Sequence, residues 1–199
     1  MLDLIGNIES ILTSFGYLAL FAIVFAESGL FFGFFLPGDS LLFTAGLLAS
    51  KGLFDLQIVL IGVAVSAIVG DQVGYWMGSR YGRGFFSREG SILRNPSHIR
   101  EAEEFYQKHG RKMIVIARFV PVVRTFAPIV AGIGKMDYRT FLTFNILGGI
   151  LWTVVFILAG FLLGQVLPNA NEVITLIVFA IIVVSLIPVG LEVWKGLNK

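Results

Sequence analysis

Residues 26–43 read AESGLFFGFFLPGDSLLF, an apolar stretch that contains two carboxylates and a Leu-Pro-Gly interruption. The acids are Glu27 and Asp39, and Pro37 and Gly38 directly precede the second. An unpaired charge is costly inside a protein, and an ionisable residue at membrane depth is a functional candidate by default. The stretch therefore predicts a broken helix in a bilayer whose two acids serve a function.

The composition of the whole chain indicates a membrane protein. Of its 199 residues, 56% are hydrophobic and only 14% are charged, and the mean hydropathy is +0.86. Soluble domains carry about 25% charged residues. A net charge of +2 gives no argument for nucleic acid, and the lack of cysteine excludes disulfides, thiolate metal sites and thiol nucleophiles. The first 14 residues lack the basic start of a cleavable signal peptide.

Interruptions distinguish two apolar segments from the others. The first is broken just before Asp39, and the second is broken at Pro121, between Arg118 and Arg124. Proline disfavours helix in the preceding residue and lacks an amide donor, so we expect two re-entrant hairpins. Uninterrupted apolar segments of about 20 residues can cross a bilayer. The prediction is an all-α integral membrane protein with a single domain over 1–199: an interfacial helix at 1–14, re-entrant hairpins at 16–50 and 112–134, transmembrane helices at 55–78, 140–166 and 172–194, and a basic loop with a surface helix at 80–112.

The distribution of Lys and Arg predicts the orientation. If both hairpins return to their starting side, Lys51 lies alone on one face and twelve basic residues lie on the other. Basic residues concentrate in cytoplasmic loops. The C-terminus and the loop at 80–112 are therefore expected in the cytoplasm, and the N-terminus outside.

The two hairpins resemble each other. Each has a Phe-x-Pro followed by Lys fourteen residues after the proline, as in Pro37 with Lys51 and Pro121 with Lys135. Each has an Ala-Gly pair in between and continues into a helix that ends in Gly-x-x-x-Gly. The basic-residue count gives the copies opposite orientations. Inverted repeats with broken helices are typical of secondary transporters, where the breaks form the binding site.

Four charged residues would meet near the middle of the membrane in this arrangement: Glu27 and Asp39 from one hairpin, Arg118 and Arg124 from the other. Pairing is the least costly way to hold them there. The planar fork of arginine suits a phosphate monoester, and a carboxylate beside arginine at low dielectric is poised to exchange protons. We therefore predict phosphate binding by the arginines and proton coupling by the acids. The alternatives are a structural ion pair, arginines that extend to the headgroups, and acids that act only as counter-charges.

Other polar residues carry weaker signals. Asp71 is expected to pack its helix or to pair with Arg80 or Arg83, and it is kept with Thr125 as an accessory candidate. No metal site is predicted, since His98 and His109 have no third ligand nearby.

An intramembrane protease and a scaffold protein are the alternatives to a transporter. Asp39 and Asp71 each follow glycine, as in an intramembrane aspartyl protease, but arginines beside Asp39 would prevent the shared proton that such a dyad needs. No serine or zinc hydrolase motif is present, so no enzyme is expected. A scaffold protein would not need four buried charges.

Three segments resemble the DedA family, the bacterial members of the VTT-domain group: Glu27 followed by FLPGD, GDQVGYWMGSRYG at 70–82, and FYQKHGRKMIVIARFVPVVRTFAPIVAG at 105–132. The resemblance extends from about Gly16 to Gly164. It implies that the four matching charged residues are essential, and that the protein is a proton-coupled transporter in the bacterial inner membrane, driven by the proton gradient without a cofactor.

The resemblance also implies a lipid substrate. Some members are proposed to return undecaprenyl phosphate to the cytoplasmic leaflet, and related eukaryotic proteins scramble phospholipids. A flippase for this polyprenyl phosphate is therefore expected. A phospholipid scramblase and a proton-coupled transporter of cations or small solutes are the alternatives, and a homo-oligomer is compatible with each.

Overall fold

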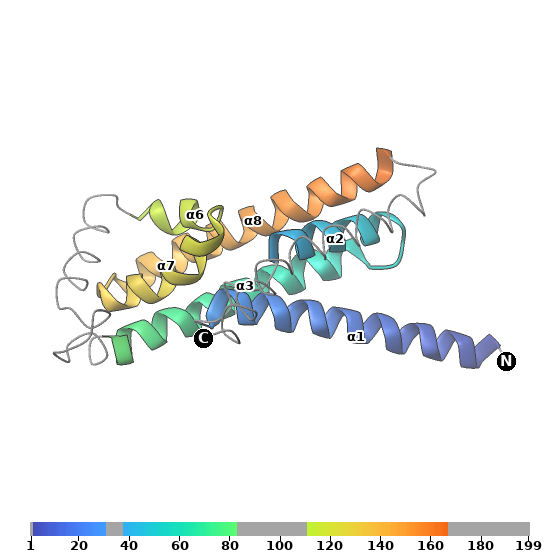
Figure 1. Cartoon of the computed structure of the whole chain (residues 1–199), viewed down its shortest axis with the longest axis horizontal. Coiled ribbons are helices and arrows are strands. Elements are labelled where there is room, and N and C mark those ends of the chain that lie inside the picture. Colours follow the sequence, from blue (N-terminus) through green and yellow to red (C-terminus); the bar gives the residue numbers. More distant parts are fainter. Residues whose placement is uncertain (1, 31–37, 83–110, 167–199) are drawn as a thin grey trace, which may run out of the picture. The chain divides into compact units, whose positions relative to one another are not determined.

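The computed structural model of the chain describes residues 2–30, 38–82 and 111–166, and every regular element in these ranges is a helix (Figure 1). The predicted helix at 172–194 lies outside these ranges, as do Pro37, both histidines and most of the loop at 80–112. The elements are α1 (Leu2–Gly29), α2 (Gly38–Ser50), α3 (Leu56–Met77) continued by the π-helical turn η2 (Gly78–Gly82), α6 (Met113–Ala117), α7 (Pro121–Ile133) and α8 (Tyr138–Val166).

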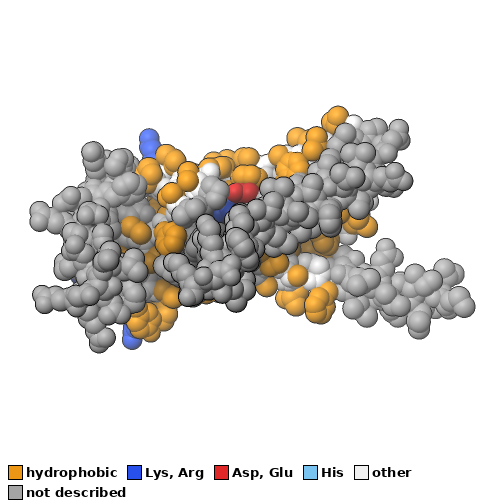
Figure 2. Space-filling model, in the orientation of Figure 1, with side chains coloured by type: hydrophobic (Ala, Val, Ile, Leu, Met, Phe, Trp, Pro, Cys, Tyr) orange, Lys and Arg blue, Asp and Glu red, His pale blue; other side chains and the backbone are white. Residues whose placement is uncertain are grey.

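Two long apolar helices occupy the segments predicted to be transmembrane at 55–78 and 140–166. Within the described residues, Leu56–Tyr81 and Tyr138–Val166 are long and apolar enough to cross a membrane. Only 28% and 33% of their most apolar windows are buried, whereas a core helix of a soluble protein would be mostly buried. Figure 2 shows hydrophobic side chains over most of the described surface that faces the viewer. The exposed apolar residues of these helices include Ile58, Ile61, Val65, Val69, Trp76, Leu147, Ile150, Leu151, Val155 and Leu162.

The N-terminal region differs from the prediction. A boundary was expected between an interfacial helix at 1–14 and the first hairpin, but α1 is continuous from Leu2 to Gly29. Gly16 lies within this helix, and an interior glycine costs a helix only about 1 kcal/mol. The position of residues 1–14 at the membrane interface stays a prediction.

Both interrupted segments contain two helices, and in each the second helix begins at the predicted break. In the first interrupted segment, α1 ends at Gly29 and a new helix begins at Gly38. In the second, α6 ends at Ala117 and α7 begins at Pro121. Val120 between them has extended backbone angles, φ −116° and ψ 107°, as expected for a residue that precedes proline. The re-entrant course of these segments in a membrane stays a prediction.

The chain divides into two compact units. Unit 1 comprises Met1–Val24, Phe35–Val63 and Thr153–Lys199, and unit 2 comprises Phe25–Phe34 and Ala64–Trp152. The helix α2 lies in unit 1, and α6 and α7 lie in unit 2. The helices α1, α3 and α8 contribute one part to each unit.

In unit 1, α2 packs directly on the C-terminal part of α8. A Cβ atom on Gly46 would overlap the backbone carbonyl of Ile157, and one on Gly160 would overlap that of Phe43. Small residues allow this close approach of two backbones in membrane proteins. Lys51, just after α2, donates a hydrogen bond from Nζ to the carbonyl oxygen of Gly164 at 2.9 Å, so it satisfies an acceptor near the end of α8.

In unit 2, α7 packs in the same way on the C-terminal end of α3. A Cβ atom on Gly132 would overlap the carbonyl of Tyr75, and one on Gly78 would overlap that of Ile129. The ring of Tyr75 also stacks on Phe141 of α8, with centroids 4.5 Å apart. Its hydroxyl donates to the carbonyl oxygen of Met136 at 2.6 Å. The glycine contacts pack α7 on the end of α3, and the Tyr75 ring joins α3 to α8.

Candidate functional site: two buried ion pairs

Unit 2 holds four buried charged side chains. The exposed fraction is 2% for Glu27, 4% for Asp71, 4% for Arg118 and 8% for Arg124. They are the only buried charged residues in the part of the chain that the structure describes. Burial of a charge is tolerable only with a partner, so the partners define the site.

Arg124 of α7 pairs with Glu27 of α1. Nη2 of the guanidinium donates a hydrogen bond to Oε1 of the carboxylate. The ring of Trp152 in α8 lies against the same guanidinium, with its centroid 4.9 Å from Cζ, which is a cation–π contact. Three helices therefore hold Arg124, and the structure brings it together with the acid that the sequence places opposite it.

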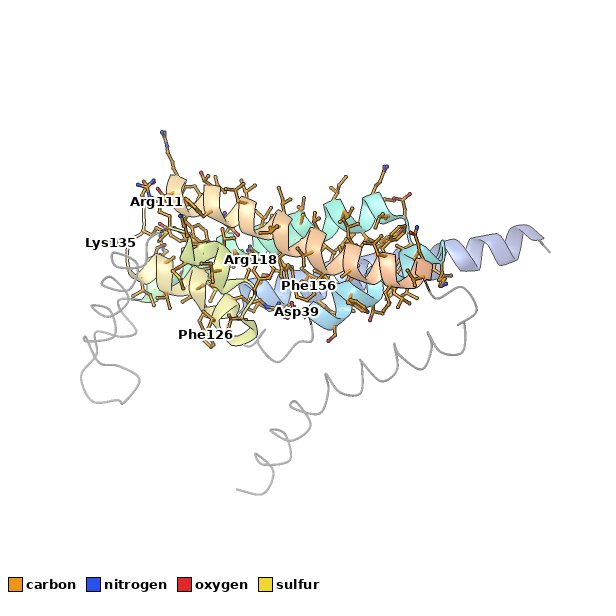
Figure 3. All side chains as sticks on the ribbon, turned by 90° about the horizontal axis from the view of Figure 1, so that it is seen from above. Asp39, Arg111, Arg118, Phe126, Lys135 and Phe156 are labelled. Carbon is orange, nitrogen blue, oxygen red and sulfur yellow. The ribbon has the colours of Figure 1, made fainter. Side chains whose placement is uncertain are left out.

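Arg118 lies at the turn between α6 and α7, as its label in Figure 3 shows, and it occupies a second buried centre. Its Nη2 donates to Oδ2 of Asp71 in α3 and to Oδ1 of Asn145 in α8. Nδ2 of Asn145 in turn donates to the carbonyl oxygen of Ile68 at 3.1 Å. Asn145 is fully buried and uses both ends of its amide, so it links Arg118 to the backbone of α3.

Two adjacent glycines of α8 leave room for the Arg118 side chain. A Cβ atom on Gly148 would lie 3.0 Å from Cδ of Arg118, and one on Gly149 would lie 3.5 Å from its Nη2. A contact of 3.0 Å is tighter than side chains ordinarily make, so alanine at Gly148 would force the arginine to move. The Gly-Gly pair therefore belongs to the site.

The structure corrects the prediction for Asp71 and does not test the one for Asp39. Asp71 pairs with Arg118, whereas the sequence suggested Arg80 or Arg83. The reason is geometric, because Asp71 is buried on α3 while Arg80 lies on the exposed turn η2. Asp39 lies in the first turn of α2, in unit 1 (Figure 3). Its expected meeting with the arginines stays a prediction.

Two residues of the site were missed in the sequence, Asn145 and Trp152. Asn145 had a detectable signal, since it is a buried-type amide in the apolar segment 140–166. Polar side chains within membrane helices commonly hydrogen-bond across helices. Trp152 had none, because an aromatic residue in an apolar helix is ordinary. Thr125, the predicted accessory residue, follows Arg124 in the sequence, and its side chain is buried.

One end of unit 2 is basic. Figure 3 shows Arg111 and Lys135 at this end. Asp137, between α7 and α8, accepts a hydrogen bond from the backbone N–H of Thr140 at 2.9 Å. That bond, the Thr140 side chain and the nearby Arg139 and Arg111 lower the pKa of Asp137 below its ordinary value. This is the end that the basic-residue count predicts to be cytoplasmic. No group of His, Cys, Asp and Glu within the described ranges could hold a metal ion.

Helices with exposed apolar surfaces, together with arginine–carboxylate pairs buried between them, are typical of an α-helical membrane protein. Comparison with known proteins identifies its family. The VTT domain family model matches residues 36–162. Protein DedA of Escherichia coli K12 is 45% identical over 179 residues, which cover 89% of this chain and 81% of that protein. The chain belongs to the DedA family.

Two further relatives carry membrane locations in their names. An uncharacterised membrane protein of Mycobacterium leprae is 44% identical over 178 residues, covering 89% of this chain and 79% of that protein. Inner membrane protein YqjA of Escherichia coli K12 is 34% identical over 154 residues, covering 75% and 68%. No solved structure matches the chain. These relatives support a membrane location for this chain.

Proposed function

We propose that this DedA-family protein is a proton-coupled transporter that moves a phosphate-headed lipid across the membrane. The substrate proposed is undecaprenyl phosphate, returned to the cytoplasmic leaflet. The observation that carries the proposal is the pair of buried arginines, each held by a carboxylate, in a protein of the membrane. Ionisable residues at such depth mark pathways for substrates, ions and protons.

Arginine is the appropriate residue for the lipid's headgroup. A guanidinium can donate two parallel hydrogen bonds to phosphate oxygens and keeps its charge at any physiological pH. Arg118 and Arg124 are the proposed phosphate ligands. Arg124 also makes a cation–π contact with Trp152. A lipid with a phosphate monoester offers more acceptor oxygens to such a site than a phosphodiester does.

Proton coupling follows from charge balance at the Arg124 pair. The resting pair is neutral, since the charge of Glu27 cancels that of Arg124. Entry of an anionic headgroup would leave a net negative charge at low dielectric unless the displaced carboxylate takes up a proton. We propose Glu27 as one proton carrier, with Asp39 as a second in the first half of the protein.

The alternation of access is proposed to come from an inverted repeat. Both α2 and α7 have 13 residues, follow a helix break and pack through glycines on the Gly-x-x-x-Gly end of a long helix. The orientation proposed places the C-terminus and the basic end of unit 2 in the cytoplasm. Repeats of this kind can rock about a fixed midplane site.

The protease alternative gains no support from the geometry. An aspartyl dyad needs two carboxylates that share one proton. Asp71 is instead paired with Arg118, whose Nη2 also donates to Asn145. The pairing of Asp71 thus favours transport over proteolysis.

Reconstitution in liposomes tests the proposal. Protein is inserted into vesicles that carry undecaprenyl phosphate or a labelled phosphatidylglycerol, and movement between leaflets is followed with and without a pH gradient. We expect movement of undecaprenyl phosphate alone, accelerated by the gradient. Equal movement of both lipids would instead identify a scramblase.

The Glu27→Gln variant tests the coupling, because glutamine keeps the shape of the side chain but cannot exchange a proton. Its transport should no longer respond to the pH gradient. Asp55→Asn is the matched control, since Asp55 is an exposed acid that precedes α3 and its variant should behave as the wild type. Gradient dependence that persists in Glu27→Gln would reduce Glu27 to a structural counter-charge.

A further inference from the structure

The number of hydrogens on Nη2 of Arg118 limits what this arginine can bind. A guanidinium nitrogen of this kind carries two hydrogens. In the structure one is donated to Asp71 and the other to Asn145. Nε of Arg118 is buried and has no hydrogen-bond partner among the described residues. The arginine thus has a spare donor, but its Nη2 is fully used.

A phosphate needs two adjacent donors to bind in the bidentate manner. Arginine offers such pairs along two edges, Nε with Nη2 and Nη1 with Nη2. Both edges include Nη2, so neither is complete while Asp71 and Asn145 are both bound. Arg118 can therefore clamp a phosphate only after one of these two partners releases Nη2.

The two partners differ in how readily they can leave. Asn145 is neutral and fully buried, and its own Nδ2 is anchored on the carbonyl oxygen of Ile68. Asp71 carries the charge that a phosphate would replace, and protonation removes that charge and one acceptor. Exchange of the Asp71 carboxylate for a monoanionic phosphate keeps the buried centre neutral only if Asp71 takes up one proton from water. Asp71 is thus the partner that can leave.

We infer that Asp71 is an additional proton-coupling acid, which occupies the phosphate-binding edge of Arg118 and vacates it on protonation, while Asn145 keeps the arginine in place. This inference rests on the proposed function and adds a residue and a stoichiometry to it, one proton per lipid phosphate at this centre. The charged groups that face Asp71 are Arg118, from the α6–α7 turn, and Arg124, from α7. The α8 residue at this centre is Asn145, which accepts a hydrogen bond from the same nitrogen of Arg118 that donates to Asp71.

The test is the pH dependence of lipid binding in wild type and in Asp71→Asn. Asparagine resembles the protonated acid, so the variant should bind without taking up that proton. Full-length protein in detergent is titrated with undecaprenyl phosphate, and fluorescence of Trp152, which contacts Arg124, reports binding. Both proteins carry Trp76→Phe and Trp194→Phe, which leaves Trp152 as the single reporter of the three tryptophans.

The expected result is that the ratio of the wild-type affinity for undecaprenyl phosphate to the Asp71→Asn affinity changes with pH. Where Asp71 is ionised in the free protein, wild-type affinity relative to that of Asp71→Asn should fall about tenfold per pH unit as pH rises, as one linked proton requires. At lower pH the two affinities should converge. Titration of Glu27 and of the lipid phosphate occurs in both proteins and cancels in the ratio. Asp55→Asn on the same background should follow the wild type at every pH.

Different failures have different meanings. A constant ratio, or loss of binding in a folded Asp71→Asn protein, would overturn the role of Asp71 and leave the proposed function intact. Absence of binding by the wild type, with phosphatidylglycerol as the comparison lipid, would overturn the proposed function together with this inference.

A second measurement decides the matter if Asp71→Asn does not fold. Infrared difference spectra of the wild type with and without undecaprenyl phosphate should show a carboxylic-acid band on binding. The band assigned to Asp71 should shift in Asp71→Glu and not in Glu27→Asp. No such band on binding would overturn the inference.

Discussion

The two units of this protein use the same packing and differ in what they bury. In each unit a 13-residue helix that follows a break, α2 or α7, lies against the glycine-rich end of a long helix, α8 or α3. Each approach is close enough that two glycines face backbone carbonyls. The same backbone arrangement is therefore stable with two different sets of side chains around it.

The buried polar residues separate the units. In unit 1, within the described ranges, these are Thr44 and Thr153, which are neutral. In unit 2 they include both arginines and their two carboxylates. Glycine packing alone does not require buried charges, since unit 1 has it without them. The charges of unit 2 thus need a reason other than folding, and phosphate and proton exchange supply one.

The largest expected effect comes from leaving one charge of unit 2 unpaired. Arg124→Gln removes the partner of Glu27, and loss of one member of a buried pair typically costs about 3–5 kcal/mol. We expect a large decrease in thermal stability in detergent and loss of lipid transport.

Arg124→Lys should be less damaging to folding but should weaken phosphate binding about ten- to a hundredfold, because lysine lacks the bidentate fork.

The double variant Arg124→Gln with Glu27→Gln separates folding from binding. Both charges are gone, so most of the lost stability should return while transport stays absent. Recovery of transport together with stability would mean that the pair is structural, and the contrast between the units would lose its functional meaning. Asp39→Asn in unit 1 is the comparison variant. It should cost less stability than Arg124→Gln, because Asp39 is only half-buried.

A smaller effect is expected from the shared packing. Gly78→Leu in unit 2 and Gly160→Leu in unit 1 each place a side chain against a backbone carbonyl. Overpacking typically costs about 1–3 kcal/mol, and backbone cannot move aside as a flexible side chain can. Both variants should lower the melting temperature by similar amounts. Val65→Leu is the control, since Val65 is an exposed residue of α3. A loss confined to one variant would show that the two packings are not equivalent.

Local backbone chemistry made the helix breaks predictable. Proline acts on its own residue and on the one before it, so the extended conformation of Val120 needed no knowledge of the tertiary structure. The same rule predicts a break at Pro37, and α2 begins directly after it at Gly38, whereas the end of α1 at Gly29 lies too far from this proline to follow from the rule. No proline separates residues 1–14 from the first hairpin, and the expected boundary is absent there because α1 continues from Leu2 to Gly29.

Charge balance predicted part of the site. The need to neutralise four buried charges led to the prediction that the two acids meet the two arginines, and the structure shows one such pair, Glu27 with Arg124, 97 residues apart in the sequence. The same reasoning gave Asp71 a partner nearby in the sequence, whereas the structure gives it Arg118, 47 residues away. Neutral residues have no charge to balance, so the partner of Asn145 and the Gly148–Gly149 slot could be recognised only once α8 was placed beside Arg118.

The smallest expected effect concerns the acids that begin the long helices. Asp55 in unit 1 accepts hydrogen bonds from the backbone N–H groups of Gln57 and Ile58 at 2.8 and 3.0 Å, at the start of α3. Asp137 in unit 2 accepts one from Thr140 at the start of α8. Both are N-caps, which satisfy amides that the helix leaves open. Asp55→Ala and Asp137→Ala should each lower the melting temperature slightly at neutral pH, and by similar amounts if the two helix starts are equivalent.

For Asp137 the effect should also depend on pH, with a definite sign. The backbone bond from Thr140 lowers the pKa of this carboxyl in the folded protein. Because the pKa is lowered in the folded protein, the ionised acid stabilises the fold when the pH is above the ordinary pKa of aspartate. This contribution is lost as the pH falls through the folded pKa. Asp137→Asn keeps an oxygen to accept the bond but cannot ionise. Its melting temperature should therefore approach that of the wild type as pH falls through this range. A difference that is constant with pH would mean that the cap acts through hydrogen-bond geometry alone.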